Sequence, residues 1–116
     1  GVSTSCTPSD SRLKRGVQTL TNSLEKLMMI EAVEYDWNDK LREYDSFKEQ
    51  EKLHTIGLIA QEVQAQFPDL VFPLPEQISG YEELLGVDYS RISPILVEAI
   101  KDLDNKITAI ENQLGS

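Results

Sequence analysis

The sequence predicts an α+β fold, a small mixed domain of short strands and helices that ends in a long C-terminal helix. Three observations lead to this prediction. Apolar residues recur at helical spacing near 24–28, alternate with polar residues over 32–38, and follow a heptad repeat from residue 96 onward. With 116 residues, 40% of them hydrophobic, the chain is long enough for one compact domain and too short for two.

The first part of the chain combines an irregular junction with a short helix. Residues 1–11 are rich in Ser, Thr, Gly and Pro and show no periodicity, so we expect extended chain there. Thr21 or Asn22 is suited to cap a helix, because both residue types accept hydrogen bonds from the first free N–H groups. The apolar positions of this helix, at i, i+3 and i+4, are Leu24, Leu27 and Met28.

Strands and a second helix are predicted along the middle of the chain. Residues 32–38 alternate apolar and acidic side chains, which is typical of a half-buried strand. Its apolar face is formed by Val33, Tyr35 and Trp37. Residues 39–52 are mostly charged and indicate an exposed loop or arm. A helix is expected over 60–67, ended by the proline that follows it, and two brief strands over 70–74 and 85–89.

The last helix carries the strongest signal. Ser90 or Ser93 is expected to cap it, and the helix should span residues 92–114. Pro94 is tolerated in its first turn. Apolar residues separated by four, three, four, three and four positions give the a/d repeat of a left-handed coiled coil: Leu96, Ile100, Leu103, Ile107, Ile110 and Leu114. Because isoleucine at both a and d disfavours two-stranded coils, we expect a parallel trimeric coiled coil with these six residues as its interface.

This apolar stripe has a second interpretation, in which it docks on the domain's own core, the commoner fate of an amphipathic helix. Fewer than three heptads is short for an autonomous coiled coil. The two interpretations are compatible if Ile92, Ile95 and Ala99 face the home core while the later turns join partner helices.

The composition excludes several classes of function. Twenty acidic residues against eleven basic ones give a net charge of -9, which repels phosphate backbones and anionic bilayers, so we expect neither nucleic acid nor a membrane as partner. One cysteine cannot form an internal disulfide, and one histidine cannot complete a Cys/His zinc cage. We therefore expect no metal and no cofactor, and a reducing compartment. No apolar run approaches the ~20 residues that span a bilayer, and the first residues lack the features of a signal peptide.

Candidate chemistry is confined to a short stretch near the N-terminus. The chain lacks the serine-hydrolase elbow, the zinc-protease motif and the phosphate-binding loop, and its single His54 is expected to be a solvated or satisfied residue. Ser9 and Lys14 are the remaining candidates, because a neutral lysine amine can take the proton of a serine hydroxyl. Their five-residue spacing puts them on different faces of a helix or a strand, so they meet only if the chain bends between them. The alternative is a capping Ser9 and a surface Lys14.

Four blocks of sequence resemble one known family. They are SDSRLK at 9–14, VEYDW at 33–37, GLIAQEVQAQFPDLV at 57–71 and GVDYSRISPILVEAIKDL at 86–103. In this order they are similar to the endosialidase-type C-terminal intramolecular chaperone domains of phage tail fibres, tailspikes and neck appendages. Residues 39–52 fall outside the resemblance.

The resemblance implies a homotrimer that templates the folding of an upstream fibrous segment of the same chain. It further implies a single-turnover serine endopeptidase with a Ser-Lys dyad, in which Ser9 is the nucleophile, Lys14 the general base, and the bond between Pro8 and Ser9 the cleavage site. Residues 1–8 would then be the junction with the fibre and 9–116 the chaperone domain. Synthesis in a host cytoplasm and a parent protein in a virion tail fibre or spike are also implied, with release of the domain after assembly.

Two other functions remain open. A trimerisation or capping module that does not cleave would stay attached to its fibre, and a monomeric adaptor would use the last helix to bind a different partner. For residues 39–52 we have the hypothesis of an arm that holds the upstream fibre during folding, against the alternative of a solvated loop.

Overall fold

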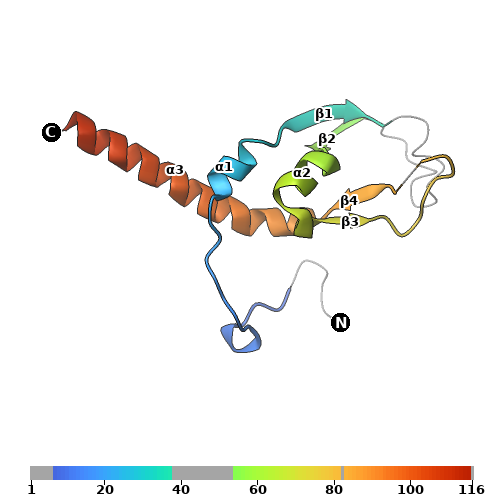
Figure 1. Cartoon of the computed structure of the whole chain (residues 1–116), viewed down its shortest axis with the longest axis horizontal. Helices are drawn as coiled ribbons and strands as arrows, with labels where there is room; N and C mark the ends of the chain where they lie inside the picture. Colours follow the sequence, from blue (N-terminus) through green and yellow to red (C-terminus); the bar gives the residue numbers. More distant parts are fainter. Residues whose placement is uncertain (1–6, 38–53, 82, 116) are drawn as a thin grey trace.

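The protein is described by a computed structural model that covers residues 7–37, 54–81 and 83–115. Figure 1 shows an α+β arrangement, as predicted, with two small strand pairs beside a short helix and a long C-terminal helix. The elements in chain order are α1 (Ser23–Leu27), β1 (Ala32–Asp36), β2 (His54–Leu58), α2 (Ala60–Gln66), β3 (Val71–Pro73), β4 (Leu85–Val87) and α3 (Ile92–Leu114). The predicted arm over 39–52 lies outside the described residues.

The strands form two antiparallel pairs, β1 with β2 and β3 with β4. In the first pair Val33 lies opposite Gly57. A Cβ atom at Gly57 would lie 2.8 Å from the hydroxyl oxygen of Tyr89, so only glycine fits there without movement. That hydroxyl accepts a hydrogen bond from the backbone N–H of Leu58 at 3.0 Å, which fastens β2 to the turn that precedes α3.

The core lies where α2 packs against the start of α3. Val63 is 1% exposed, and Leu70 and Ile95 are buried beside it. Ala99, one turn after Ile95, is buried as well, and Ile92 packs against the same cluster. The first turns of α3 therefore face the home core, as predicted for Ile92, Ile95 and Ala99.

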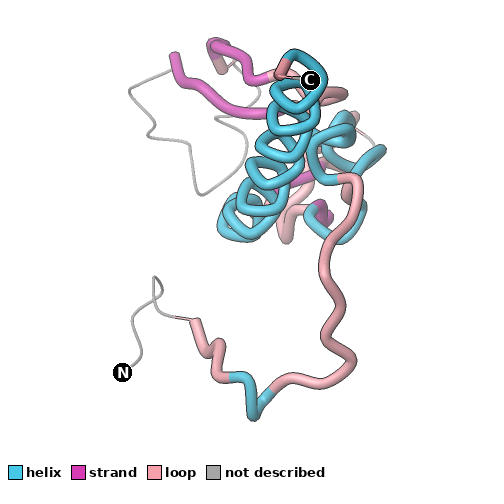
Figure 2. Tube along the Cα trace, turned by 90° about the vertical axis from the view of Figure 1, so that its left-hand side faces the viewer, coloured by secondary structure: helices cyan, strands magenta, loops and turns pink. Residues whose placement is uncertain are grey.

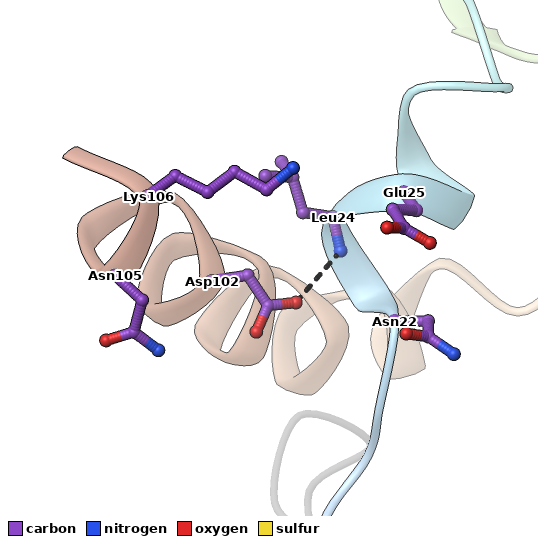
Figure 3. Close-up of a pocket in the computed structure, with 6 residues that line it drawn as sticks. All are labelled: Asn22, Leu24, Glu25, Asp102, Asn105 and Lys106. Carbon is purple, nitrogen blue, oxygen red and sulfur yellow. Dashed lines mark hydrogen bonds between the residues drawn. The ribbon is translucent and has the colours of Figure 1, made fainter. Parts of the chain in front are cut away.

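The short helix α1 lies across α3, as Figure 1 shows. Asn22 occupies its N-cap position with a left-handed φ of 58°, and its side chain makes no capping hydrogen bond. The carboxylate of Asp102 in α3 instead accepts a hydrogen bond from the backbone N–H of Leu24 at 3.3 Å (Figure 3). The predicted side-chain cap by Thr21 or Asn22 is therefore wrong, because a residue of another helix satisfies the free N–H group.

Two further local predictions are also wrong. Met28 is 75% exposed rather than buried, because α1 ends at Leu27 and Met28 follows as its C-cap. Neither predicted serine caps α3: the residue before α3, Arg91, already has helical dihedral angles, so no residue there has the extended backbone of a capping serine. Asp88 caps the preceding 3₁₀ turn, Tyr89–Arg91, by accepting from the N–H of Ser90 at 3.2 Å.

None of the helices in the described ranges combines the length and the apolarity that crossing a bilayer requires.

Candidate functional site

The structure brings the two predicted site residues together. The ammonium of Lys14 donates a hydrogen bond to the hydroxyl oxygen of Ser9, with 2.8 Å between Nζ and Oγ. A 3₁₀ turn, Ser11–Leu13, supplies the bend between them, and the chain is extended at Asp10 before it and at Lys14 after it. The condition set by the five-residue spacing is therefore met, while the catalytic roles of the pair stay predictions.

The turn is capped by Asp10, a residue that was not predicted to take part in the site. One oxygen of its carboxylate accepts from the backbone N–H of Arg12 at 2.9 Å. The same carboxylate pairs with the guanidinium of Arg12, at 3.0 Å to Nε and 2.9 Å to Nη2. An aspartate two residues before a free N–H group is a known turn signal, and this signal predicts the cap.

The Asp10–Arg12 pair is open to water, yet each residue shifts the pKa of the other. Hydrogen bonding to the Arg12 side chain, and then to its backbone N–H, lowers the pKa of Asp10 below its ordinary value. The same carboxylate raises the pKa of Arg12. The pair therefore remains ionised at neutral pH.

The segment that carries Ser9 and Lys14 stands away from the rest of the molecule, as Figure 2 shows. All residues from 7 to 22 are exposed. Among them are large apolar side chains, with Leu13 75% and Val17 76% exposed. The described part of the chain has a radius of gyration of 18.7 Å, against about 13 Å for a compact domain of this length. Within one chain, Lys14 is open to water.

The six residues of the predicted interface form an exposed stripe on α3. Their side chains are between 46% and 81% exposed, with Leu114 at the upper end. Figure 1 shows the C-terminal half of α3 extending past the other elements. The alternative in which this stripe docks on the domain's own core is therefore contradicted for these six residues: Leu96, Ile100, Leu103, Ile107, Ile110 and Leu114.

His54 lies at the first residue of β2 and is satisfied by two carboxylates of β1. Its Nδ1 atom is 2.8 Å from an oxygen of Asp36, and its Nε2 atom is 3.3 Å from an oxygen of Glu34. The hydrogen bond with Asp36, and next the one with Glu34, raises the pKa of His54. This environment is the satisfied one expected from the sequence. Over the described ranges no three His, Cys, Asp or Glu side chains are arranged to hold a metal ion.

Comparison with known proteins identifies the family. Residues 9–72 match a peptidase family described as the chaperone of endosialidase, and this match begins at Ser9. The chain is also similar to myelin regulatory factor homolog 1 of Caenorhabditis elegans, with 30% identity over 102 residues. That alignment covers 86% of this chain but 11% of the relative, so the chain spans about a tenth of the relative's length. With more than half of its residues matched by the family, this chain belongs to the chaperone-of-endosialidase family of self-cleaving peptidases.

Proposed function

We propose that this chain is a C-terminal intramolecular chaperone that forms a parallel homotrimer, templates the folding of a fibrous segment preceding it, and releases itself by cutting between Pro8 and Ser9. The observation that carries the proposal is the 2.8 Å hydrogen bond between Lys14 and Ser9 in a chain of this family. The exposed heptad stripe of α3 supports the trimeric half of the proposal.

The trimer forms through the stripe on α3. A contiguous run of exposed Leu and Ile side chains marks an association surface, because a soluble monomer seldom leaves such a surface in water. Isoleucine at the a positions Ile100 and Ile107 and at the d position Ile110 favours three or more strands over two. The buried Ile95 and Ala99 anchor the same helix to its own domain, so the coiled coil extends rigidly from each subunit.

Cutting requires that the hydrogen bond between Ser9 and Lys14 reverse its direction. Lys14 now donates to Ser9, whereas a general base must accept the serine proton. With a neutral Lys14 amine, Ser9 Oγ loses its proton to Nζ and bonds to the carbonyl carbon of Pro8, in its own chain or in a neighbouring copy. The bond from that carbon to the nitrogen of Ser9 breaks, and the nitrogen receives the proton from Nζ. Water then hydrolyses the ester, which leaves a Pro8 carboxylate and a free Ser9 amine.

Association with a neighbouring copy provides the neutral Lys14 amine that this proton transfer requires. The neutral form of a lysine is favoured by removal from water, and Lys14 is exposed in the single chain. The exposed apolar residues on the same segment, Leu13 and Val17, are suited to pack on a neighbouring copy. A copy that covers this segment desolvates Lys14, so the cut follows trimer formation.

The chaperone role follows from the cost of aligning three chains. Intertwined fibrous folds begin slowly, because distant segments must meet in register before any contacts stabilise them. A trimeric seed at the C-terminus fixes that register. Once the seed is removed, the fibre has no template for refolding, and its lifetime depends on a high barrier to unfolding. We place such a parent in a virion tail fibre or spike made in a host cytoplasm.

A second candidate, a trimerisation or capping module that stays attached, is favoured by one observation. In this structure Lys14 is exposed and donates to Ser9, which is the opposite of the direction that a general base requires. If no neighbouring copy covers Lys14, the pair remains in this state and the chain stays whole.

The experiment is intact-mass spectrometry of the chain and of three variants, with trimer formation measured in parallel. Ser9→Ala and Lys14→Ala are expected to remain uncut yet trimeric. Ser11→Ala is the matched control, because Ser11 lies in the same turn but takes no part in the hydrogen bond with Lys14, and it is expected to be cut like the parent chain. Cleavage that is unchanged in both Ser9→Ala and Lys14→Ala would remove the dyad assignment.

A further inference from the structure

We propose that Asp10 and Arg12 are positioning residues that hold Ser9 and Lys14 within hydrogen-bonding distance. The inference rests on the proposed function, since it assigns a task to residues beside the proposed dyad. Neither residue is given a part in the chemistry itself. They act through the turn that lies between the two members of the pair.

The contact between Ser9 and Lys14 depends on one short turn. The backbone is extended at Asp10 (ψ 133°) and at Lys14 (ψ 148°), so the whole reversal occurs in Ser11–Leu13. Two backbone hydrogen bonds close it, from the N–H of Leu13 to the carbonyl of Asp10 at 3.0 Å and from the N–H of Lys14 to the carbonyl of Ser11 at 3.2 Å. If this turn opens, an extended chain places Ser9 and Lys14 on opposite faces.

The buried core does not stabilise this turn. None of its residues is buried, and the surrounding residues from 7 to 22 are exposed as well. A 3₁₀ turn of this length has poor hydrogen-bond geometry and is not stable by itself. Local side-chain contacts must therefore hold it in place.

Asp10 provides these contacts from both of its oxygens. Oδ1 accepts from the backbone N–H of Arg12 at 2.9 Å and from its Nε at 3.0 Å, while Oδ2 accepts from Nη2 at 2.9 Å. The planar guanidinium binds both carboxylate oxygens through two N–H groups, a fork of two hydrogen bonds. This fork fixes the carboxylate in the orientation that caps the turn. One carboxylate thus joins the backbone of the turn to a charged side chain.

If the Asp10–Arg12 pair only stabilises the domain, its loss should lower the unfolding midpoint slightly and leave the cleavage rate of the folded chain unchanged. Exposed pairs of this kind contribute little to the stability of a whole domain. The positioning role predicts that loss of the pair slows cleavage while the unfolding midpoint of the domain stays the same. Cleavage rate and unfolding midpoint therefore separate the two interpretations.

The first measurement is the rate at which the chain beginning at Ser9 appears in the mass spectrum, with the trimer confirmed for each variant. Asp10→Ala removes cap and fork and is expected to slow cleavage about tenfold, the effect of losing a helix cap. Asp10→Asn keeps an oxygen that can accept from the N–H of Arg12, so an intermediate rate is expected. Arg12→Lys retains the charge without the fork and is expected to be slowed less than Asp10→Ala.

Added salt distinguishes the ion pair from the cap. The parent chain is expected to slow as ionic strength rises, because the exposed pair is screened, whereas Asp10→Asn is expected to show a flat response. Cleavage of a folded, trimeric Asp10→Ala variant at the parental rate would overturn the positioning role.

A second measurement does not depend on cleavage. Nuclear Overhauser contacts between the side chains of Ser9 and Lys14 are expected in the parent chain and are expected to be lost in Asp10→Ala. If the parent chain is never cut, the cleaving half of the proposed function fails, and this measurement still decides the positioning role. Contacts that persist in Asp10→Ala overturn it.

Discussion

The carboxylate of Asp102 accepts a hydrogen bond from the backbone N–H of Leu24 at 3.3 Å, and this contact joins the middle of α3 to the first turn of α1. It lies in a shallow hollow between the two helices, which Figure 3 shows together with Asn22 and Lys106. The segment that carries Ser9 and Lys14 enters the domain at α1 (Figure 1). The contact therefore ties the origin of that segment to the helix that carries the apolar stripe.

Asp102→Ala is expected to lower the free energy of unfolding by about 1 kcal/mol, the usual effect of losing a capping acceptor. Urea denaturation at fixed protein concentration measures it, because the stability of an oligomer depends on concentration. Asp104→Ala, an exposed aspartate two residues along α3, is the matched control and is expected to leave the midpoint unchanged. Equal effects of the two substitutions would contradict the contact.

Gly57→Ala is expected to destabilise the chain by about 1 kcal/mol, since the new Cβ would displace Tyr89 and disrupt its hydrogen bond with Leu58. In a Tyr89→Phe background the hydroxyl is absent, so the same glycine substitution should have a smaller effect. A double-mutant cycle in thermal denaturation measures this coupling. Strictly additive effects would show that Tyr89 does not restrict position 57.

The interaction of His54 with Asp36 predicts a pH-dependent stability. The raised pKa of His54 means that the folded chain retains the proton at a pH where the unfolded chain has lost it. The stabilisation is fully present below the unfolded pKa and is lost as pH rises through the folded pKa. Urea midpoints of the parent chain and His54→Asn should therefore differ more at about pH 5.5 than at about pH 8.5. A difference that is constant with pH would rule out this coupling.

Ile107→Glu is expected to abolish the trimer at micromolar concentration, because it places a charge at the centre of the stripe on α3. Thr108→Glu is the matched control: the neighbouring residue is also exposed but lies outside the a/d positions, so this variant should remain trimeric. Size-exclusion chromatography with light scattering compares the two. If both variants form trimers, the stripe on α3 is not the trimer interface.

The sequence was most informative where a pattern extends over many residues. The heptad spacing of α3 identified a helix that the structure gives as Ile92–Leu114, and alternation identified β1. Caps were predicted less well, because they depend on contacts from elsewhere in the chain. Asp102 lies 78 residues from Leu24, and no local pattern near α1 signals it. The expected caps Ser90 and Ser93 failed because a 3₁₀ turn runs directly into α3.

The candidate site, too, was predicted only in part. The residue types of Ser9 and Lys14 made them candidates and the family resemblance assigned their roles, but their contact required a bend that spacing alone does not give. The 3₁₀ turn Ser11–Leu13 makes the bend, and Asp10 caps this turn and pairs with Arg12, a local pattern that is present in the sequence. Lys14 is exposed, as in the alternative of a surface lysine, but Asp10 rather than Ser9 caps the turn.

Association of three copies through α3 underlies both halves of the proposed function, and sedimentation equilibrium of the uncut Ser9→Ala variant of the 116-residue chain measures it. We expect a particle of about 39 kDa, three times the chain mass of 13.1 kDa, that persists on dilution to micromolar concentration. A particle with the mass of one chain at high concentration would contradict it.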